Sequence, residues 1–384
     1  MAALLVAAGV TACGTEATPD TGPSGKGPGA TQQPGPTPQH AAHAAHQPRE
    51  RPFTLVGTGD LLIHDSLIRQ ARADAGGTGH SFRRMLADAE RTADSADLAL
   101  CHMETVYGEK EGPFTGYPEF KTPPRLAADV KAAGYDGCST ASNHTLDAGT
   151  DGIARTLGAM DEAGLRHAGS ARSAKEARTP AWLRAGGATV AHLAYTYGTN
   201  GIPKPKPWSV NLIDTRRILA DAKAARKAGA DVVVVSPHWG TEFQQAPDRL
   251  QRRVARELTA SPDIDLILGT HAHVPQAYEK RNGTWVVYGM GDQVAGVMDD
   301  PRGSMGSAPR FTFRPPAEPG GRWRVARAEF IPTYADPERG YRATNLPRAE
   351  KAGPLTAKQA GARRTVREAV LSLGAAKDGL REGR

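Results

Sequence analysis

From residue 52 onward, short apolar runs alternate with amphipathic stretches, and this alternation constrains the fold more than any other feature. Several runs, such as "ADVVVVSPHWG" and "IDLILGTHAH", are apolar almost throughout, as expected for strands that are covered on both faces. Between them, "RLAADVKAAG", "DGIARTLGAMDEAG" and "DRLQRRVAREL" carry apolar residues at helical spacing. The first two end at Gly134 and Gly164, which suits the left-handed position after a helix. The alternation predicts a layered α/β fold.

The pattern changes after about residue 300. "RFTFRP" and "GRWRVARAEFIPTY" predict a hairpin or edge strands, and "ARRTVREAVLSLG" places Val366, Val370 and Leu373 on one helical face. We therefore interpret residues 52–300 as the main domain, and residues 301–384 as C-terminal strands and a closing helix of that same domain.

The first residues resemble an export signal. "VTAC" is similar to the lipobox of bacterial lipoproteins, with Cys13 as the lipid-bearing residue, although the usual positive region is missing. Either the start codon lies upstream or the likeness is accidental. Residues 14–51 are rich in Pro, Gly, Thr, Gln and His, which predicts a solvated linker. Together, residues 1–13 and the linker predict a protein that is lipid-anchored to the outer face of the bacterial cell membrane.

The charge and the cysteines limit the partners. The net charge of +7 suits anionic partners such as phosphates or cell-envelope polymers. The sequence has no zinc-finger spacing, long basic tract or aromatic ladder, so we expect no nucleic-acid partner. Cys101 and Cys138 could pair in an exported protein, or remain two buried thiols. The oligomeric state is not predicted.

Polar residues gather where the predicted strands end. The five junctions are "GTGDLLIHD", "CHMETV", "STASNHTLDAG", "SPHWGTEF" and "GTHAHVPQ". Ligands of open α/β sheets bind at the carboxyl edge of the strands. The donors that these junctions would bring together are Asp60, His64, His102, Glu104, Asn143, His144, Asp147, His238, Glu242, His271 and His273.

Carboxylate, amide and neutral imidazole groups together favour a divalent cation such as Zn, Mn or Fe. Taken alone, each member has a plainer explanation. Asp60 could cap a helix, Glu104 could be a solvated loop acid, and His238 beside Trp239 could be a packed core histidine. Because such residues occur at five successive strand ends, the pattern favours a site for one or two metal ions over a chance arrangement.

The order of these motifs resembles the CapA family, which is associated with poly-γ-glutamate capsule biosynthesis. The likeness runs from about residue 53 to 296 and includes "FKTPPRLAADVKAAGYDGCSTASNHTLDAG" and "YTYGTNG". The family in turn is similar to the calcineurin-like metallophosphoesterases. This resemblance implies a four-layer αββα sandwich with mixed sheets.

The resemblance also implies roles for single residues. Asp60 and His273 would bind one metal, and Glu104 would bridge both metals. Asn143, His238 and His271 would bind the second metal. His144 would donate a proton to the leaving group, and Asp147 would accept a hydrogen bond from its ring and fix its tautomer.

Two positions depart from the pattern. The first motif is usually Asp-x-His, but Leu62 stands at the histidine position, and His64 is a possible additional ligand. The first metal site would therefore have the smaller ligand set. Asp292 stands where the family usually shows Asn, and the sequence assigns it no role.

Two functions follow. One is a metal-dependent hydrolase that acts on a phosphoester or amide of an anionic envelope polymer. In that case metal ions would polarise the substrate and lower the pKa of a bound water. The alternative is a non-catalytic, metal-stabilised accessory subunit for polymer synthesis or export.

Overall fold

The computed structural model describes residues 50–318 and 320–384. Cys13 with the predicted lipobox, and nearly all of the linker 14–51, lie outside the described residues. Within the described ranges, we find no helix with the length and apolar character needed to cross a membrane.

The strands form two sheets within the described chain, and both are mixed. The first sheet has the order β14-β13-β12-β1-β2-β3-β4, with β11 paired to β1 and β15 paired to β13. Its strands are β1 (Phe53–Leu62), β2 (Leu98–Met103), β3 (Gly137–Ser139), β4 (Arg166–Ala168), β11 (Asp292–Ala295), β12 (Met305–Arg314), β13 (Arg324–Asp336), β14 (Arg342–Asn345) and β15 (Leu380–Glu382).

The second sheet has the order β5-β6-β7-β8-β10-β9. Its strands are β5 (Ala181–Ala185), β6 (Ala188–Thr196), β7 (Val232–His238), β8 (Leu266–Leu268), β9 (Tyr278–Arg281) and β10 (Thr284–Val287). The helices are α1 (Asp65–Asp74), α2 (Arg83–Ala93), α3 (Arg125–Ala132), α4 (Gly149–Ala163), α5 (Thr215–Lys227), α6 (Arg249–Thr259), α7 (Leu346–Ala352) and α8 (Ala357–Leu371).

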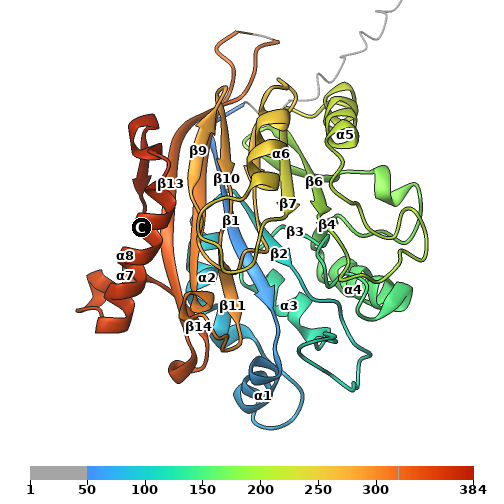
Figure 1. Ribbon diagram of the computed structural model, residues 1–384, viewed down its shortest axis with the longest axis vertical. Helices are drawn as coiled ribbons and strands as arrows, with labels where there is room; N and C mark the ends of the chain where they lie inside the picture. Colours follow the sequence, from blue (N-terminus) through green and yellow to red (C-terminus); the bar gives the residue numbers. More distant parts are fainter. Residues whose placement is uncertain (1–49, 319) are drawn as a thin grey trace, which may run out of the picture. The chain divides into compact units, whose positions relative to one another are not determined.

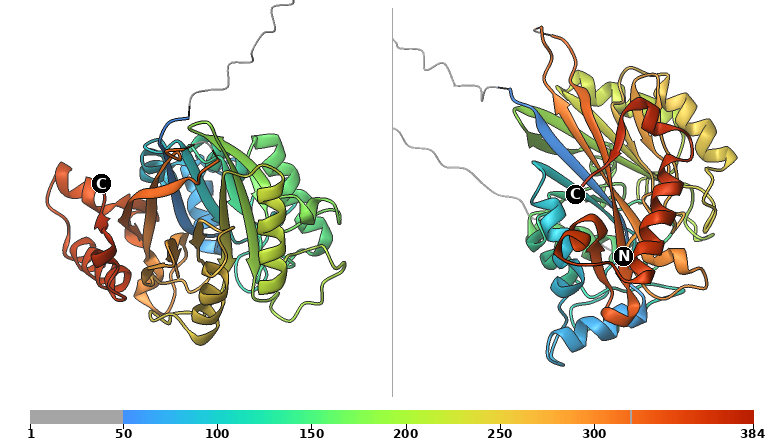
Figure 2. Two further views of the ribbon diagram at one scale, coloured as in Figure 1. Left: turned by 90° about the horizontal axis from the view of Figure 1, so that it is seen from above. Right: turned by 90° about the vertical axis from the view of Figure 1, so that its left-hand side faces the viewer.

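The two sheets pack face to face, with helices outside them (Figures 1 and 2). Leu55 and Leu100 of the first sheet share one buried cluster with Val234 and Leu268 of the second. The outer face of the first sheet packs against α1 to α3 in another cluster. The outer face of the second packs against α5 and α6. These layers confirm the predicted αββα sandwich.

The C-terminal part differs from the prediction in two details. β12 and β13 form the expected hairpin, but both have a partner on each side and so are interior strands. Val366 and Val370 of α8 are buried in the core between the sheets. Leu373 lies beyond the end of α8 and is 37% exposed, so it does not extend that buried face.

The run "TWVVYGMGD" is divided between the two sheets. Its first residues form β10 beside β8, whereas Asp292 begins β11, which pairs with β1. The crossing brings the backbone of Gly291 against β1, where its carbonyl accepts a hydrogen bond from the Asp60 N–H. A Cβ on Gly59 would lie 1.7 Å from the Gly291 oxygen, so this close approach requires glycine.

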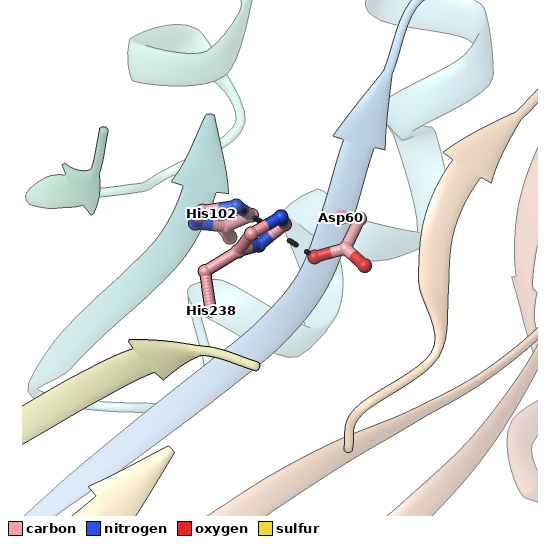
Figure 3. A group of neighbouring side chains, drawn as sticks. All are labelled: Asp60, His102 and His238. Atoms are coloured by element: carbon pink, nitrogen blue, oxygen red, sulfur yellow. Dashed lines mark ion pairs between the residues drawn. The ribbon is translucent and has the colours of Figure 1, made fainter. Parts of the chain in front are cut away.

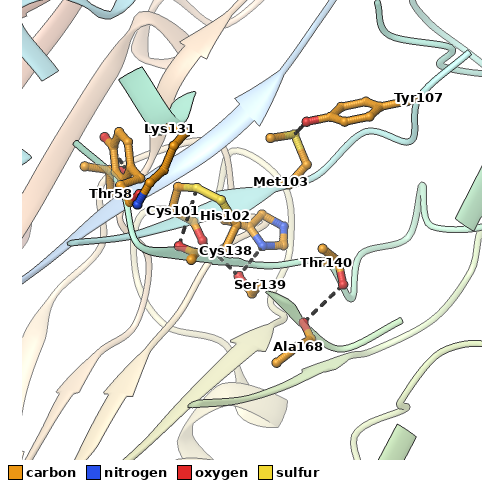
Figure 4. The surroundings of a disulfide bond; sticks show 12 residues. Thr58, Cys101, His102, Met103, Tyr107, Lys131, Cys138, Ser139, Thr140 and Ala168 are labelled. Carbon is orange, nitrogen blue, oxygen red and sulfur yellow. Dashed lines mark hydrogen bonds between the residues drawn. A yellow bond between two sulfur atoms is a disulfide. The ribbon is translucent and has the colours of Figure 1, made fainter. Parts of the chain in front are cut away.

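Cys101 and Cys138 are joined by a disulfide, which decides between the two alternatives (Figure 4). They face each other in the register of the parallel strands β2 and β3. The bond therefore ties together two strands that end at the polar site.

Candidate metal centre

The predicted ligands converge at the carboxyl ends of strands from both sheets. Asp60 lies on β1, Glu104 directly after β2, and His238 at the end of β7. The remaining predicted ligands lie in the loops after β3 and β8. The side chains that come together in this way are all buried, namely Asp60, Glu104, Asn143, His238, His271 and His273.

Three overlapping groups of side chains have ligand atoms within 4.8 Å of one another. The first, shown in Figure 3, is Asp60, His102 and His238. The others are Glu104 with His271 and His273, and Asp60 with His273 and Asp292. Five of the six predicted ligands belong to these groups. The sixth, Asn143, places Oδ1 2.8 Å from Nε2 of His238.

The distances between the ligand atoms are short enough for two of them to bind the same cation. Nε2 of His238 and Nε2 of His273 each lie 3.7 Å from Oε1 of Glu104. Two ligands of one cation, each about 2.0–2.2 Å from it, can be at most about 4.4 Å apart. Glu104 therefore stands between both imidazoles, as a bridging acid would.

Several buried polar atoms of this cluster have no hydrogen-bond partner among the described residues. They are Oδ1 of Asp60, Nε2 of His102, both carboxylate oxygens of Glu104, Nδ1 of His271 and Oδ2 of Asp292. Burying such atoms without a partner costs free energy, and a cation would satisfy oxygen and imidazole donors alike. The residues present therefore fit a divalent metal ion.

The electrostatics lead to the same conclusion. Burial, and then the charge of Asp292, raise the pKa of Asp60 to about 8. Burial also raises the pKa of Glu104 well above its usual range. Burial, and then neighbouring imidazoles, hold the pKa values of His238 and His271 well below theirs. His238 and His271 are therefore neutral, the state in which imidazole binds a metal. At His273 burial is outweighed by the charges of Asp292 and Glu104, which raise its pKa well above the usual value, so a single imidazole faces several carboxylates.

The loop after β8 holds its histidines in an uncommon backbone conformation. His271 has a φ of 91° and His273 a φ of 54°, values that residues other than glycine rarely adopt. The His271 N–H donates a hydrogen bond to Oδ2 of Asp60 at 3.1 Å. Strain of this kind persists where surrounding contacts fix the loop, and it is concentrated at functional sites.

Two residues that orient ligands were missed by the sequence analysis. Oδ1 of Asp292 lies 2.9 Å from Nδ1 of His273, so that Nε2 faces Glu104. Oδ1 of Asn200 accepts a hydrogen bond from Nδ2 of Asn143 at 3.2 Å, which directs the Asn143 oxygen towards His238. Such outer partners fix the ring or amide that binds the metal. Asp292 had a visible signal, because it ends an apolar run as Asp60 does.

His144 and Asp147 form the predicted pair. Nδ1 of His144 lies 2.8 Å from Oδ2 of Asp147, and the Phe120 N–H donates to the same oxygen at 2.8 Å. The ring of Phe120 meets that of His144 edge to face, with centroids 4.6 Å apart. These contacts fix the imidazole and leave its Nε2 for a ligand.

Position 62 supplies no donor, and His64 lies apart from the three groups. Leu62 is buried with Phe120 and Ala295. Nδ1 of His64 accepts a hydrogen bond from the Gly296 N–H at 3.0 Å. A ligand role for His64 remains a prediction.

Tyr197 borders the site from the side of the solvent. It is 41% exposed, and its ring centroid lies 4.5 Å from that of His271. Burial, and then the charges of Glu242 and Glu104, raise its pKa to about 12.

Fold and site together define an α/β sandwich protein with a buried donor set for a divalent cation. A family model described as bacterial capsule synthesis protein PGA_cap matches residues 54–297, and the chain belongs to this family. The predicted CapA membership is thereby confirmed.

Among curated relatives, the chain is 30% identical over 170 residues to the capsule biosynthesis protein CapA of Bacillus anthracis, covering 43% of this chain and 41% of that protein. It is also 30% identical to the PGA biosynthesis protein CapA of Bacillus subtilis, covering 43% of this chain and 44% of that protein. A probable polyglutamine synthesis accessory protein of Mycobacterium tuberculosis is 27% identical, with 57% and 59% covered. The matches thus span less than half the length of the two CapA proteins.

Solved structures with some similarity include the calcineurin-like phosphoesterase YfkN from Bacillus subtilis. It is 14% identical with a TM-score of 0.48, and 82% of this chain and 99% of that chain are covered. A phosphatase from Mycoplasma pneumoniae is 12% identical with a TM-score of 0.46, and 76% and 96% are covered.

Proposed function

We propose that this protein is a metal-dependent hydrolase that acts on a phosphoester or amide of an anionic cell-envelope polymer, in the context of poly-γ-glutamate biosynthesis. The observation that carries the proposal is the neighbourhood of two groups. A buried set of unpartnered carboxylate and imidazole atoms lies next to an imidazole that is already braced by a carboxylate.

Each group would have a separate task. Asp60, Glu104, Asn143, His238, His271 and His273 would hold one or two divalent ions. A bound divalent ion would polarise a substrate oxygen and lower the pKa of a water ligand.

His144 would serve as the general acid. Its Nδ1–H donates to Asp147, and a second proton, on Nε2, would pass to the leaving group. Asp147 would stabilise the charged imidazolium in that state. Tyr197, which is partly exposed above His271, would pack against the substrate where it enters.

The proposal also includes location. The predicted lipid anchor at Cys13 and the linker 14–51 would hold the domain on the outer face of the cell membrane, where envelope polymers lie. Labelling of intact cells with radioactive palmitate would test the anchor, and a Cys13→Ala variant should take up no label.

A panel of phosphoesters and γ-glutamyl peptides, assayed with Mn, Zn or Fe(II), tests the activity. We expect turnover of at least one class that disappears on chelation and in His144→Ala. Absence of turnover on both classes, in protein shown to hold metal, would contradict the hydrolase.

A second candidate is a non-catalytic accessory subunit, favoured by the name of the Mycobacterium tuberculosis relative, a probable polyglutamine synthesis accessory protein. This function predicts no turnover, but binding to poly-γ-glutamate that weakens as salt is added, because the chain carries a net charge of +7.

A further inference from the structure

His102 is a buried imidazole at the site to which neither the family pattern nor the proposed mechanism gives a role. His102 lies on β2, two residues before Glu104, and it is opposite Asp60 in the register of β1 and β2. Aligned residues of neighbouring strands point to the same face of a sheet. Nε2 of His102 accordingly lies 3.9 Å from Oδ1 of Asp60 (Figure 3).

A hydrogen bond to Ser139 fixes which nitrogen of His102 faces the site. Nδ1 of His102 lies 2.7 Å from Oγ of Ser139. The Ser139 hydroxyl donates to the Cys101 carbonyl at 3.5 Å, so Ser139 is left to accept from the histidine. In that arrangement Nδ1 carries the proton, and Nε2 presents its lone pair towards Asp60.

That lone pair has no protein partner in the described ranges, although the side chain is only 1% exposed. Oδ1 of Asp60, the nearest carboxylate oxygen to it, is likewise unpartnered there. Their separation is below the limit of about 4.4 Å for two ligands of one cation. His238, whose ring centroid lies 4.7 Å from that of His102, completes the group.

We infer that His102 is a ligand of the cation held by Asp60, and that it supplies the imidazole that position 62 lacks. The inference rests on the metal site of the proposed function and deepens it. The donor moves from β1, where Leu62 is packed in an apolar cluster, to the neighbouring strand β2. Asp60 would then share its ion with His102 and His238, the group whose ligand atoms all lie within 4.8 Å of one another.

His192 provides a matched control. It too is fully buried, its Nε2 lies 2.8 Å from the Ser236 hydroxyl, and its other nitrogen lacks a partner among the described residues. It belongs to none of the three donor groups. Substitution of His102 or of His192 thus removes a buried histidine that contacts a serine, but only substitution of His102 is expected to change metal binding.

The test titrates metal-free full-length protein with Co²⁺ and Zn²⁺, for wild type, His102→Asn and His192→Asn. Asn at position 102 can still reach Ser139 but cannot reach Asp60. We expect His102→Asn to lose one equivalent of metal, or to bind it at least about tenfold more weakly, with a changed Co²⁺ visible spectrum. His192→Asn should titrate as wild type does. Unchanged stoichiometry, affinity and spectrum in folded His102→Asn would overturn the inference.

If His102→Asn does not fold, anomalous diffraction from zinc-loaded wild-type crystals decides the question. An ion about 2.0–2.1 Å from Nε2 of His102 supports the inference, and an ion more than about 3 Å away overturns it. Wild-type protein that takes up no metal at all would instead refute the metal site of the proposed function.

Discussion

The metal donor cluster and the His144–Asp147 pair lie next to each other but are satisfied in different ways. The pair is complete in itself, since Asp147 accepts hydrogen bonds from the His144 ring and from the Phe120 backbone. The donor cluster contains buried oxygen and nitrogen atoms without a partner among the described residues. The His144–Asp147 pair is therefore held in place without a ligand, whereas the donor cluster needs a cation to satisfy its buried atoms. Metal and proton chemistry should accordingly be separable by mutation.

The largest effect is expected from removing a predicted ligand. His271→Ala or Asn143→Ala should abolish metal binding and lower turnover at least about a thousandfold, because a bound ion supplies several kcal/mol of charge stabilisation. Elemental analysis and rate measurements on the same preparation check this, with His192→Asn as a buried-histidine control. Turnover that survives loss of the metal would contradict the catalytic role of the donor cluster.

His144→Ala should separate the two groups. We expect turnover to fall by about 10²- to 10⁴-fold, the usual contribution of a general acid. Metal content should stay as in wild type, because His144 belongs to none of the donor groups found in the described residues. Full turnover of this variant on a confirmed substrate would contradict the general-acid role of His144.

Asn200 sharpens the comparison at the boundary between the groups. Asn200→Gly removes the acceptor for the Asn143 amide but tolerates the left-handed φ of 50°. We expect metal affinity to fall about 10- to 100-fold. Asn200→Asp keeps an acceptor oxygen and should bind nearly as well as wild type. Equal affinity of the Gly variant, measured by calorimetric titration, would remove the orienting role.

The smallest effect concerns a buried imidazole outside both groups. Burial lowers the pKa of His192 to about 4 from 6.5. The unfolded chain therefore takes up this proton first, and stability falls as the pH is lowered through 6.5. The loss for this single group is about 1 kcal/mol between about pH 8 and about pH 6. Denaturant unfolding of metal-free wild type and His192→Gln should show the shallower pH slope in the variant.

The same difference explains how much the sequence could predict. His144 and Asp147 lie three residues apart in one short segment, so the family resemblance of that segment was enough to imply their hydrogen bond. The role of Asp292 depends on the chain crossing between sheets at Gly291, which places it beside His273 from a distant position. Apolar runs indicated the layers, but not where one run divides between two sheets.

His102 illustrates the remaining limit. The family pattern includes Glu104, two residues further on, and implies its role. The role of His102 depends instead on the register that aligns this residue of β2 with Asp60 of β1. A strand register is set by tertiary contacts and is not visible in one strand alone.

The most direct test of the account is the metal content of the purified full chain, measured together with its thermal unfolding before and after chelation. We expect one or two equivalents of a transition metal. Because the cation binds the folded chain through otherwise unpaired buried atoms, we also expect a stabilisation of about 2.7 kcal/mol when free metal is about 100 times its dissociation constant. Folded protein that takes up no transition metal, and that unfolds at the same temperature with and without chelator, would contradict the account.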